Sequence, residues 1–166
     1  MTYSKKVIEH FKNPHNQGII KNADAVGKVG NPICGDIMLL YIKVRKDRKG
    51  REIIKDIKFE TLGCVAAIAT SSIITDLAKG QTLEKAMKID QDKVVKSLGG
   101  LPPIKLHCSV LAAGALSEAI YNYLSKNKKK IPQELQEKHQ RIEREKREIK
   151  KKYKEWIKIE EEMYKK

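Results

Sequence analysis

The sequence predicts an α+β fold, in which a small antiparallel sheet packs against several helices and a long helix follows at the C-terminus. Segments that alternate between apolar and polar residues lie before residue 63, whereas most segments with helical periodicity lie after it. Strands followed by helices favour α+β over a repeated βαβ arrangement. With 166 residues, of which 40% are hydrophobic, the chain can bury the core of one domain and carry an appendage.

The N-terminal part is predicted to contain one short helix and a β-hairpin. A helix over residues 4–11 begins at a serine that can cap it and ends before an Asn-Pro pair. Residues 15–35 are rich in glycine and are predicted to be mostly loop. Residues 36–47 alternate in hydrophobicity, a DRKG turn follows, and residues 52–63 resume with β-branched side chains. This pattern predicts two antiparallel strands.

Four helices are predicted between the hairpin and the C-terminal extension. Residues 65–80 place apolar side chains on one helical face and end at a glycine. Thr82 and Asp90 can each cap a short helix. Residues 107–126 again show helical periodicity, and a glycine pair and a proline pair precede them.

The composition changes after residue 126, which divides the chain into residues 1–126 and a basic helical extension, residues 127–166. The segment KNKKKIP reads as a linker, and the residues after it contain no further glycine or proline. An apolar stripe recurs every seven residues, formed by Leu135, Ile142, Ile149, Trp156 and Met163. The second heptad stripe is mostly polar, so we expect one long helix that docks by a narrow seam, with Trp156 against an apolar surface.

Composition also bounds the class of protein. The net charge of +14 is typical of nucleic-acid-binding proteins, but half of it lies after residue 125, and the chain has only two Phe and one Trp. A lysine-rich solvated surface is therefore the preferred interpretation. No apolar run is long enough to span a membrane, and no signal peptide is recognisable, which predicts a cytoplasmic protein. Three cysteines, an odd number, fit reduced thiols.

The three cysteines all lie at the ends of predicted elements, where their side chains can converge at one edge of the sheet. A histidine and an aspartate stand close to two of them, which gives the set Cys34, Asp36, Cys64, His107 and Cys108. Two of the cysteines are expected near helix N-termini, where negative charge is favoured. Glycines beside two cysteines leave room for a bulky ligand. The pattern predicts a metal or cluster site, although a lone buried cysteine can also serve as a small hydrophobic residue.

Four motifs within residues 2–125 resemble the IscU/NifU-type iron–sulfur cluster assembly scaffold proteins. They are YSKKVIEHFKNPHNQG, GNPICGD, FETLGCVAAIATSS and LPPIKLHCS. The resemblance implies that Cys34, Cys64 and Cys108 are cluster ligands, with Asp36 and His107 as additional site residues. It also implies that sulfur arrives as a persulfide from a pyridoxal-phosphate cysteine desulfurase of the IscS/NifS type.

The same resemblance assigns a partner to the proline-containing segment before the last cysteine. That segment matches the stretch which an Hsp70-type chaperone recognises in the family, and here it consists of Leu101, Pro102, Pro103, Ile104 and Lys105. Ile104 stands where the family usually has valine. We expect an extended, proline-stiffened handle, directly beside the ligand pair His107 and Cys108.

These observations predict a scaffold protein that is not an enzyme, on which iron and persulfide sulfur form a transient [2Fe–2S] cluster for transfer to apo-proteins. Such a cluster needs four protein ligands, and three cysteines leave it one short. The fourth ligand is His107 or Asp36, and neither suits the iron as well as a thiolate. Weak ligation favours release, which a scaffold needs and an electron carrier does not. Cys108 is the preferred first sulfur acceptor because of its helix-terminal setting and the nearby Lys105.

Two alternatives are weighed against the scaffold. A SufU-type zinc-dependent sulfur acceptor is related, but that branch typically carries an insertion before the last cysteine and lacks the adjacent histidine. Here 43 residues separate Cys64 from Cys108, and His107 is present, although zinc could occupy the same ligands. The second alternative is a basic adaptor that uses residues 127–166 to hold RNA or an acidic partner. Self-association, the formation of [4Fe–4S] and the role of this extension stay open.

Overall fold

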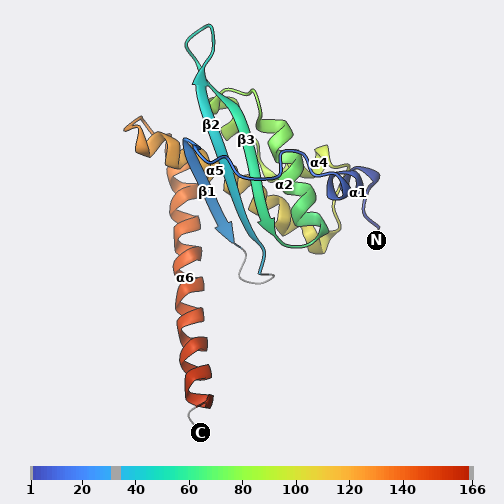
Figure 1. Cartoon of the computed structure of the whole chain (residues 1–166), viewed down its shortest axis with the longest axis vertical. Helices are drawn as coiled ribbons and strands as arrows, with labels where there is room; N and C mark the ends of the chain where they lie inside the picture. The colour runs from blue at the N-terminus through green and yellow to red at the C-terminus, as the bar shows by residue number, and fades with distance from the viewer. Residues whose placement is uncertain (1, 31–34, 165–166) are drawn as a thin grey trace.

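A three-stranded antiparallel sheet in the order β1-β2-β3 forms one layer, and helices α2 and α5 pack against it (Figure 1). The structure is a computed structural model that describes residues 2–30 and 35–164. Its elements are α1 (Lys5–Lys12), β1 (Ala25–Gly30), β2 (Ile37–Lys46), β3 (Glu52–Leu62), α2 (Val65–Ala78), α3 (Leu83–Met87), α4 (Gln91–Ser97), the 3-10 helix η1 (Pro103–Lys105), α5 (Leu106–Lys126) and α6 (Gln133–Tyr164). The predicted α+β class is confirmed.

Three helices begin at the capping residues that the sequence predicts. The Ser4 hydroxyl accepts a hydrogen bond from the Val7 N–H at the start of α1, at 3.1 Å. Thr82 caps α3, and Asp90 caps α4 by accepting from the Lys93 N–H at 2.9 Å. These side chains satisfy N–H groups that have no partner within the helix.

The hairpin of β2 and β3 presents one face to the core. Alternate residues of β2, among them Met38 and Leu40, are almost fully buried, and Leu40 lies opposite Phe59 of β3. This alternation has the period of two that a half-buried strand requires. The predicted hairpin is confirmed, with one irregularity in register between Lys43 and Val44.

The prediction that residues 15–35 are mostly loop is wrong for β1. Glycines at 27 and 30 lower the local strand propensity, but Gly27 is needed for packing. A Cβ atom on Gly27 would lie 2.1 Å from the Ala115 carbonyl oxygen and 2.6 Å from the Ala119 nitrogen of α5. The side-chain amide of Asn122 also donates to the Val26 carbonyl at 2.8 Å. Close contact with α5 therefore specifies a strand that local pattern does not reveal.

Helix α6 docks on α5 through part of the predicted seam and then continues beyond the core (Figure 1). Leu135 and Ile142 are buried, whereas Met163 is 72% exposed. The narrow seam is therefore confirmed at Leu135 and Ile142, Ile149 is partly buried, and Met163 lies outside the seam. The side chain of Trp156 falls outside what the structure describes, so its predicted packing stays a prediction. Across the described residues, none of the helices is long and apolar enough to cross a membrane.

A buried carboxylate also fastens α6 to α5. Glu118 of α5 is 2% exposed, and its Oε1 lies 2.7 Å from Nδ1 of His139 on α6. The His139 ring stacks on Tyr121 at 3.7 Å between centroids, and the Lys146 ammonium lies 3.8 Å from Oε2 of Glu118. Burial raises the pKa of Glu118 above its usual value, while His139 and Lys146 pull it down.

Replacing Gly27 with alanine tests the contact between β1 and α5. Because the new methyl group would overlap backbone atoms of α5, we expect Gly27→Ala to lower the free energy of unfolding by about 3 kcal/mol. Gly114→Ala is the matched control, since a Cβ atom there finds only side chains at 3.6 Å or more. Urea unfolding of both variants measures the difference, and equal stabilities would contradict this packing.

The stability of Glu118→Gln relative to the wild type is expected to depend on pH. A carboxyl group whose pKa is higher in the folded than in the unfolded chain stabilises the fold fully below the unfolded pKa, and this contribution is lost as the pH rises through the folded pKa. Glutamine cannot ionise, so Glu118→Gln should gain stability relative to the wild type between about pH 4 and pH 7. Urea titrations at both values measure this shift. Glu134→Gln, at an exposed carboxylate, should show no such gain, and parallel behaviour of the two variants would contradict the prediction.

Candidate functional site

Two helix N-termini meet at the end of the sheet where β3 stops. Cys64 is the N-cap residue of α2, and Cys108 is the third residue of α5. Asp36 directly precedes β2 on the same side. Helix N-termini present unpaired N–H groups and positive partial charge, which favour an anionic ligand. The predicted convergence of these three positions is therefore present.

The sulfur and oxygen atoms of these residues lie at metal-binding distances from one another. Sγ of Cys64 is 3.9 Å from Sγ of Cys108, too far for a disulfide bond. The Cys108 thiol lies 3.8 Å from Oδ2 of Asp36, which accepts its weak hydrogen bond. Two thiolates bound to one tetrahedral metal at bond lengths of about 2.3 Å are about 3.8 Å apart. The two cysteines thus fit a shared tetrahedral centre.

His107 completes the arrangement with an unused donor atom. Its Nε2 is buried and has no hydrogen-bond partner among the described residues. Its distance to Oδ2 of the Asp36 carboxylate is 4.0 Å, which is too far for a hydrogen bond. Buried polar atoms without a partner are rare and destabilise a fold. One donor atom from each of Asp36, His107 and Cys108 lies within 4.8 Å of the others, so a metal would satisfy this nitrogen.

Gly63 gives Asp36 its place in the site. A Cβ atom on Gly63 would lie 2.8 Å from Oδ1 of Asp36 and 2.7 Å from the Cβ of Ala67. The space that was expected to admit a ligand at this glycine is therefore filled by the Asp36 carboxylate. Gly35 has open space around it and a φ of +73°, so glycine serves the backbone conformation there. The expectation that glycine makes room for a ligand is therefore corrected at Gly63, whereas the open space at Gly35 agrees with it.

Lys105 supplies positive charge at the rim. The negative charge of the Cys64 thiolate raises the pKa of Lys105, with smaller contributions from Tyr3 and Cys108, while desolvation opposes the shift. The ammonium group is therefore placed to attract an anionic cluster or to stabilise a thiolate.

The segment Leu101–Lys105 is only partly the extended handle that its prolines suggest. Pro102 is extended, but Pro103–Lys105 form the 3-10 turn η1, closed by a bond from the Lys105 N–H to the Pro102 carbonyl at 2.8 Å. Proline fixes φ at a value that this turn also accepts, which explains the correction. Ile104 projects from the turn and is 77% exposed. The turn leads directly into α5 and hence to His107.

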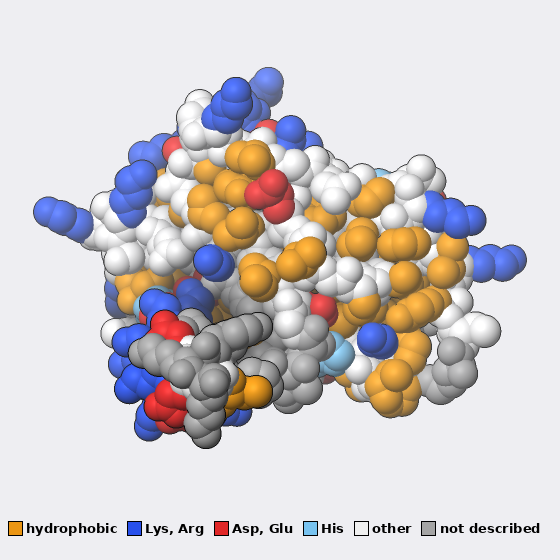
Figure 2. All heavy atoms as spheres, turned by 60° about the horizontal axis from the view of Figure 1, so that its bottom comes forward, with side chains coloured by type: hydrophobic (Ala, Val, Ile, Leu, Met, Phe, Trp, Pro, Cys, Tyr) orange, Lys and Arg blue, Asp and Glu red, His pale blue; other side chains and the backbone are white. Residues whose placement is uncertain are grey.

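Hydrophobic side chains gather on the end of the molecule that carries this site (Figure 2). They flank the ligand positions in the chain, and those that are large and exposed are Ile37, Leu62, Ile104, Leu106 and Val110. A contiguous exposed apolar surface around a polar centre is typical of a protein-binding site. Cys34 lies outside the described residues, so its predicted place among the ligands stays a prediction.

Helix α6 forms one wall of a groove of about 500 Å³ that reaches the site. The groove lies between α5 and α6, and His107 is one of its lining residues. Lys138, Arg141 and Lys146 contribute positive charge from α6. This groove was not predicted from the sequence. The heptad stripe indicates which face of α6 docks, but it does not indicate that the helix docks beside the cysteine site.

Comparisons with known proteins show which proteins the chain is similar to. A family model described as the NifU-like N terminal domain matches residues 2–130. Iron-sulfur cluster assembly scaffold protein IscU 1 of Archaeoglobus fulgidus is 58% identical over 127 residues, which cover 76% of this chain and 80% of that protein. The protein named IscU in Aquifex aeolicus is 44% identical over 124 residues, with coverage of 75% and 77%.

Solved structures share the fold at lower sequence identity. A crystal structure described as an iron-sulfur cluster assembly scaffold for the SUF system of Fervidobacterium islandicum matches with a TM-score of 0.56 and 25% identity. The match covers 71% of this chain and 96% of that one. The N-terminal part of a NifU-like protein from Brucella abortus matches with a TM-score of 0.58 and 20% identity, over 74% and 94% of the two chains. The second likeness bears on the fold alone.

Replacing Gly63 with alanine is expected to weaken metal binding without removing any ligand. The new methyl group would displace the Asp36 carboxylate, so Zn²⁺, used as a probe, should bind about tenfold more weakly. Gly30→Ala is the control, since a Cβ atom there meets Asp36 only at its carbonyl oxygen, 3.6 Å away. Calorimetric titration measures both affinities. If Gly63→Ala binds Zn²⁺ as tightly as Gly30→Ala does, Asp36 has no part in the site.

Proposed function

The chain belongs to the NifU-like N-terminal domain family, and on this premise we propose that it is a scaffold on which an iron–sulfur cluster is assembled and then passed to apo-proteins. Relatives at 58% and 44% identity are named scaffold proteins rather than enzymes. The cluster is the cargo of this process and not a resident cofactor. We place the function in residues 1–126, with residues 127–166 as a basic helical extension, and we place the protein in the cytoplasm.

The observation that carries the proposal is the buried Nε2 of His107 without a hydrogen-bond partner among the described residues, beside two thiols and a carboxylate. A nitrogen in this setting is satisfied when iron is bound. A [2Fe–2S] cluster needs four protein ligands. We assign them to Cys34, Cys64, Cys108 and His107, and we expect Zn²⁺ in iron-free protein to be held by the cysteines together with Asp36 or His107.

Asp36 is proposed to make the cluster labile. Its carboxylate lies within 4.0 Å of both Cys108 Sγ and His107 Nε2, so it can displace either ligand with little movement. A carboxylate oxygen is a hard ligand and holds cluster iron less firmly than a thiolate does. Exchange between the two kinds of ligand gives the cluster a route off the protein.

Sulfur is proposed to enter through Cys108. Its thiolate attacks the outer sulfur of a persulfide on a cysteine desulfurase, which forms the new S–S bond and releases the desulfurase thiolate. An external reductant then supplies two electrons for each sulfur that becomes sulfide. Cys108 is only 1% exposed, so transfer requires the mouth of the site to open when the desulfurase binds. Lys105 can stabilise the thiolates at this step.

The zinc-dependent sulfur acceptor is the weaker alternative. The structure described for the SUF system is 25% identical to this chain, whereas the scaffold of Archaeoglobus fulgidus is 58% identical. The two functions differ in their product, because an acceptor holds one zinc ion and passes sulfur on, whereas a scaffold accumulates iron and sulfide together.

Anaerobic reconstitution with Fe²⁺, cysteine and a desulfurase tests the proposed function. We expect visible absorbance from a cluster with two irons and two sulfides per chain, and transfer of that cluster to an apo-ferredoxin. Cys64→Ser and His107→Ala should form little stable cluster, whereas His139→Gln, outside the site, should behave as the wild type. In the same assay Asp36→Ala should hold its cluster longer and transfer it more slowly. Tightly bound zinc without any cluster would favour the alternative, and an unchanged transfer rate in Asp36→Ala would refute its role in release.

The exposed turn before α5 is proposed to bind an Hsp70-type chaperone. Ile104 is 77% exposed and lies next to the ligand-bearing end of α5, so a chaperone that grips it can disturb His107 and Cys108. Ile104→Ala should weaken binding of the substrate domain of such a chaperone about tenfold. Ile19→Ala, at an apolar side chain that is 53% exposed and does not belong to the apolar surface around the site, is the control. Equal affinities of the two variants, measured by fluorescence anisotropy, would exclude this turn as the handle.

A further inference from the structure

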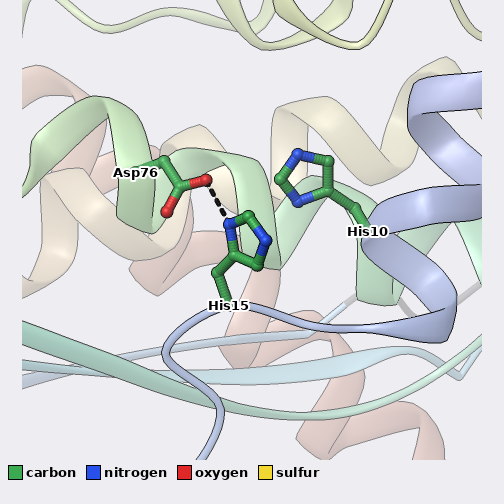
Figure 3. Close-up of side chains that lie close together, drawn as sticks. All are labelled: His10, His15 and Asp76. Carbon is green, nitrogen blue, oxygen red and sulfur yellow. Dashed lines mark hydrogen bonds and ion pairs between the residues drawn. The ribbon is translucent and has the colours of Figure 1, made fainter.

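A second group of metal-binding side chains lies at the opposite end of α2 from Cys64. His10 of α1, His15 of the following loop and Asp76 in the last turn of α2 come together, with His15 between the other two (Figure 3). One donor atom from each lies within 4.8 Å of the others. Asp76 is the twelfth residue after Cys64, which places it about 18 Å away along the helix axis. This group is therefore distinct from the cysteine site.

Several hydrogen bonds hold the carboxylate and the His15 ring in place. Nδ1 of His15 lies 2.6 Å from Oδ2 of Asp76, and the side-chain amide of Asn16 donates to Oδ1 at 3.4 Å. The same amide donates to the Thr75 hydroxyl at 2.9 Å, and the backbone N–H of His15 donates to the Ser72 hydroxyl at 2.8 Å. Asn16 adopts a left-handed φ of 56°, which turns the loop onto α2. The donor atoms are thus positioned before any ion binds.

His10 adds a second imidazole, and the hydrogen bonds of His15 and Asn16 that hold the loop on α2 do not depend on it. It is 5% exposed, its ring centroid is 4.6 Å from that of His15, and its Nδ1 lies 2.7 Å from Oγ of Ser72. Burial, followed by the charge of His15, lowers the pKa of His10, whereas the charge of Asp76 raises it. Glu9 and Lys6 act on His10 only more weakly. Two adjacent imidazoles disfavour each other's protonation, whereas a metal ion between them binds both.

We propose that His10, His15 and Asp76 bind a divalent first-row transition metal ion at a site separate from the cysteines. Two imidazoles and one carboxylate suit Zn²⁺, Co²⁺ and Fe²⁺, and water can fill the remaining coordination positions. The ion takes the place of the proton between His15 and Asp76, and that proton moves to Nε2 of His15, a side chain that is 46% exposed. Binding through Nδ1 of His10 requires the Ser72 side chain to leave its present position, in which its Oγ lies 2.7 Å from that nitrogen.

Such an ion would add a bond between three segments, of which α1 and α2 already pack against each other. It would clamp α1 and the loop after it to the C-terminal turn of α2. The site contains no sulfur, so it can hold an ion without competing for the persulfide that the proposed function delivers. It stands independently of that function, since its ligands are distinct from those of the cluster.

Titration of Co²⁺ into the full-length triple variant Cys34→Ser, Cys64→Ser, Cys108→Ser tests the site. Co²⁺ absorption distinguishes sulfur from nitrogen and oxygen ligands, and calorimetry gives the stoichiometry. We expect this background to bind one Co²⁺ with a spectrum that shows no sulfur ligation. Adding Asp76→Asn should weaken binding at least about tenfold. Adding Asp56→Asn instead removes a carboxylate of similar exposure and should change nothing.

Histidine ring signals in NMR spectra provide a second readout that does not depend on affinity alone. Paramagnetic Co²⁺ should broaden the resonances of His10 and His15 and spare those of His139. Circular dichroism checks that each variant is folded. Three results would overturn the proposal: no stoichiometric binding by the triple variant, equal binding after Asp76→Asn, or broadening of His139 in place of His10 and His15.

Discussion

The close approach of two backbones at Gly27 is the constraint on which the functional site depends. With no side chain at this position, β1 lies directly against α5 at Ala115 and Ala119, and this contact fixes the helix relative to the sheet. The N-terminus of α5 then reaches the edge where β3 ends and α2 begins, and Cys108 lies 3.9 Å from Cys64. A scaffold must hold a cluster and then release it, so we expect its ligands to bind the cluster weakly. The ligand side chains must therefore be held in position by the fold and not by the cluster.

The same fold explains how the site can be both ready for metal and labile. Two helix N-termini supply positive partial charge for an anionic cluster, and Lys105 adds a full charge at the rim. Asp36 enters the space that Gly63 leaves, while Nε2 of His107 stays buried without a hydrogen-bond partner among the described residues. Under the proposed function, iron binding would recover the energy lost at that nitrogen in metal-free protein. The nearby carboxylate would then offer the iron a competing ligand, which favours transfer.

Much of the fold and most of the candidate site could be predicted from the sequence, because capping residues and hydrophobic periodicity act locally. Ser4, Thr82 and Asp90 mark helix starts, and ordered motifs bring four of the five expected site residues together. Strand β1 could not be predicted, since Gly27 serves a contact almost ninety residues away in the chain. The position of Asp36 against Gly63, the 3-10 turn before α5 and the groove beside α6 likewise depend on tertiary packing. Cys34, the fifth residue, lies outside the described part of the chain.

The central claim is that the thiols and His107 at the two helix N-termini hold iron and sulfide together. Mössbauer spectroscopy of protein reconstituted anaerobically with ⁵⁷Fe tests it most directly, because it reports the ligands of each iron separately. The account predicts two unequal iron sites of a [2Fe–2S] cluster, one with sulfur ligands only and one with nitrogen as well, and loss of that inequality in His107→Cys. Two equivalent irons in the wild type, or iron bound without sulfide, would contradict it.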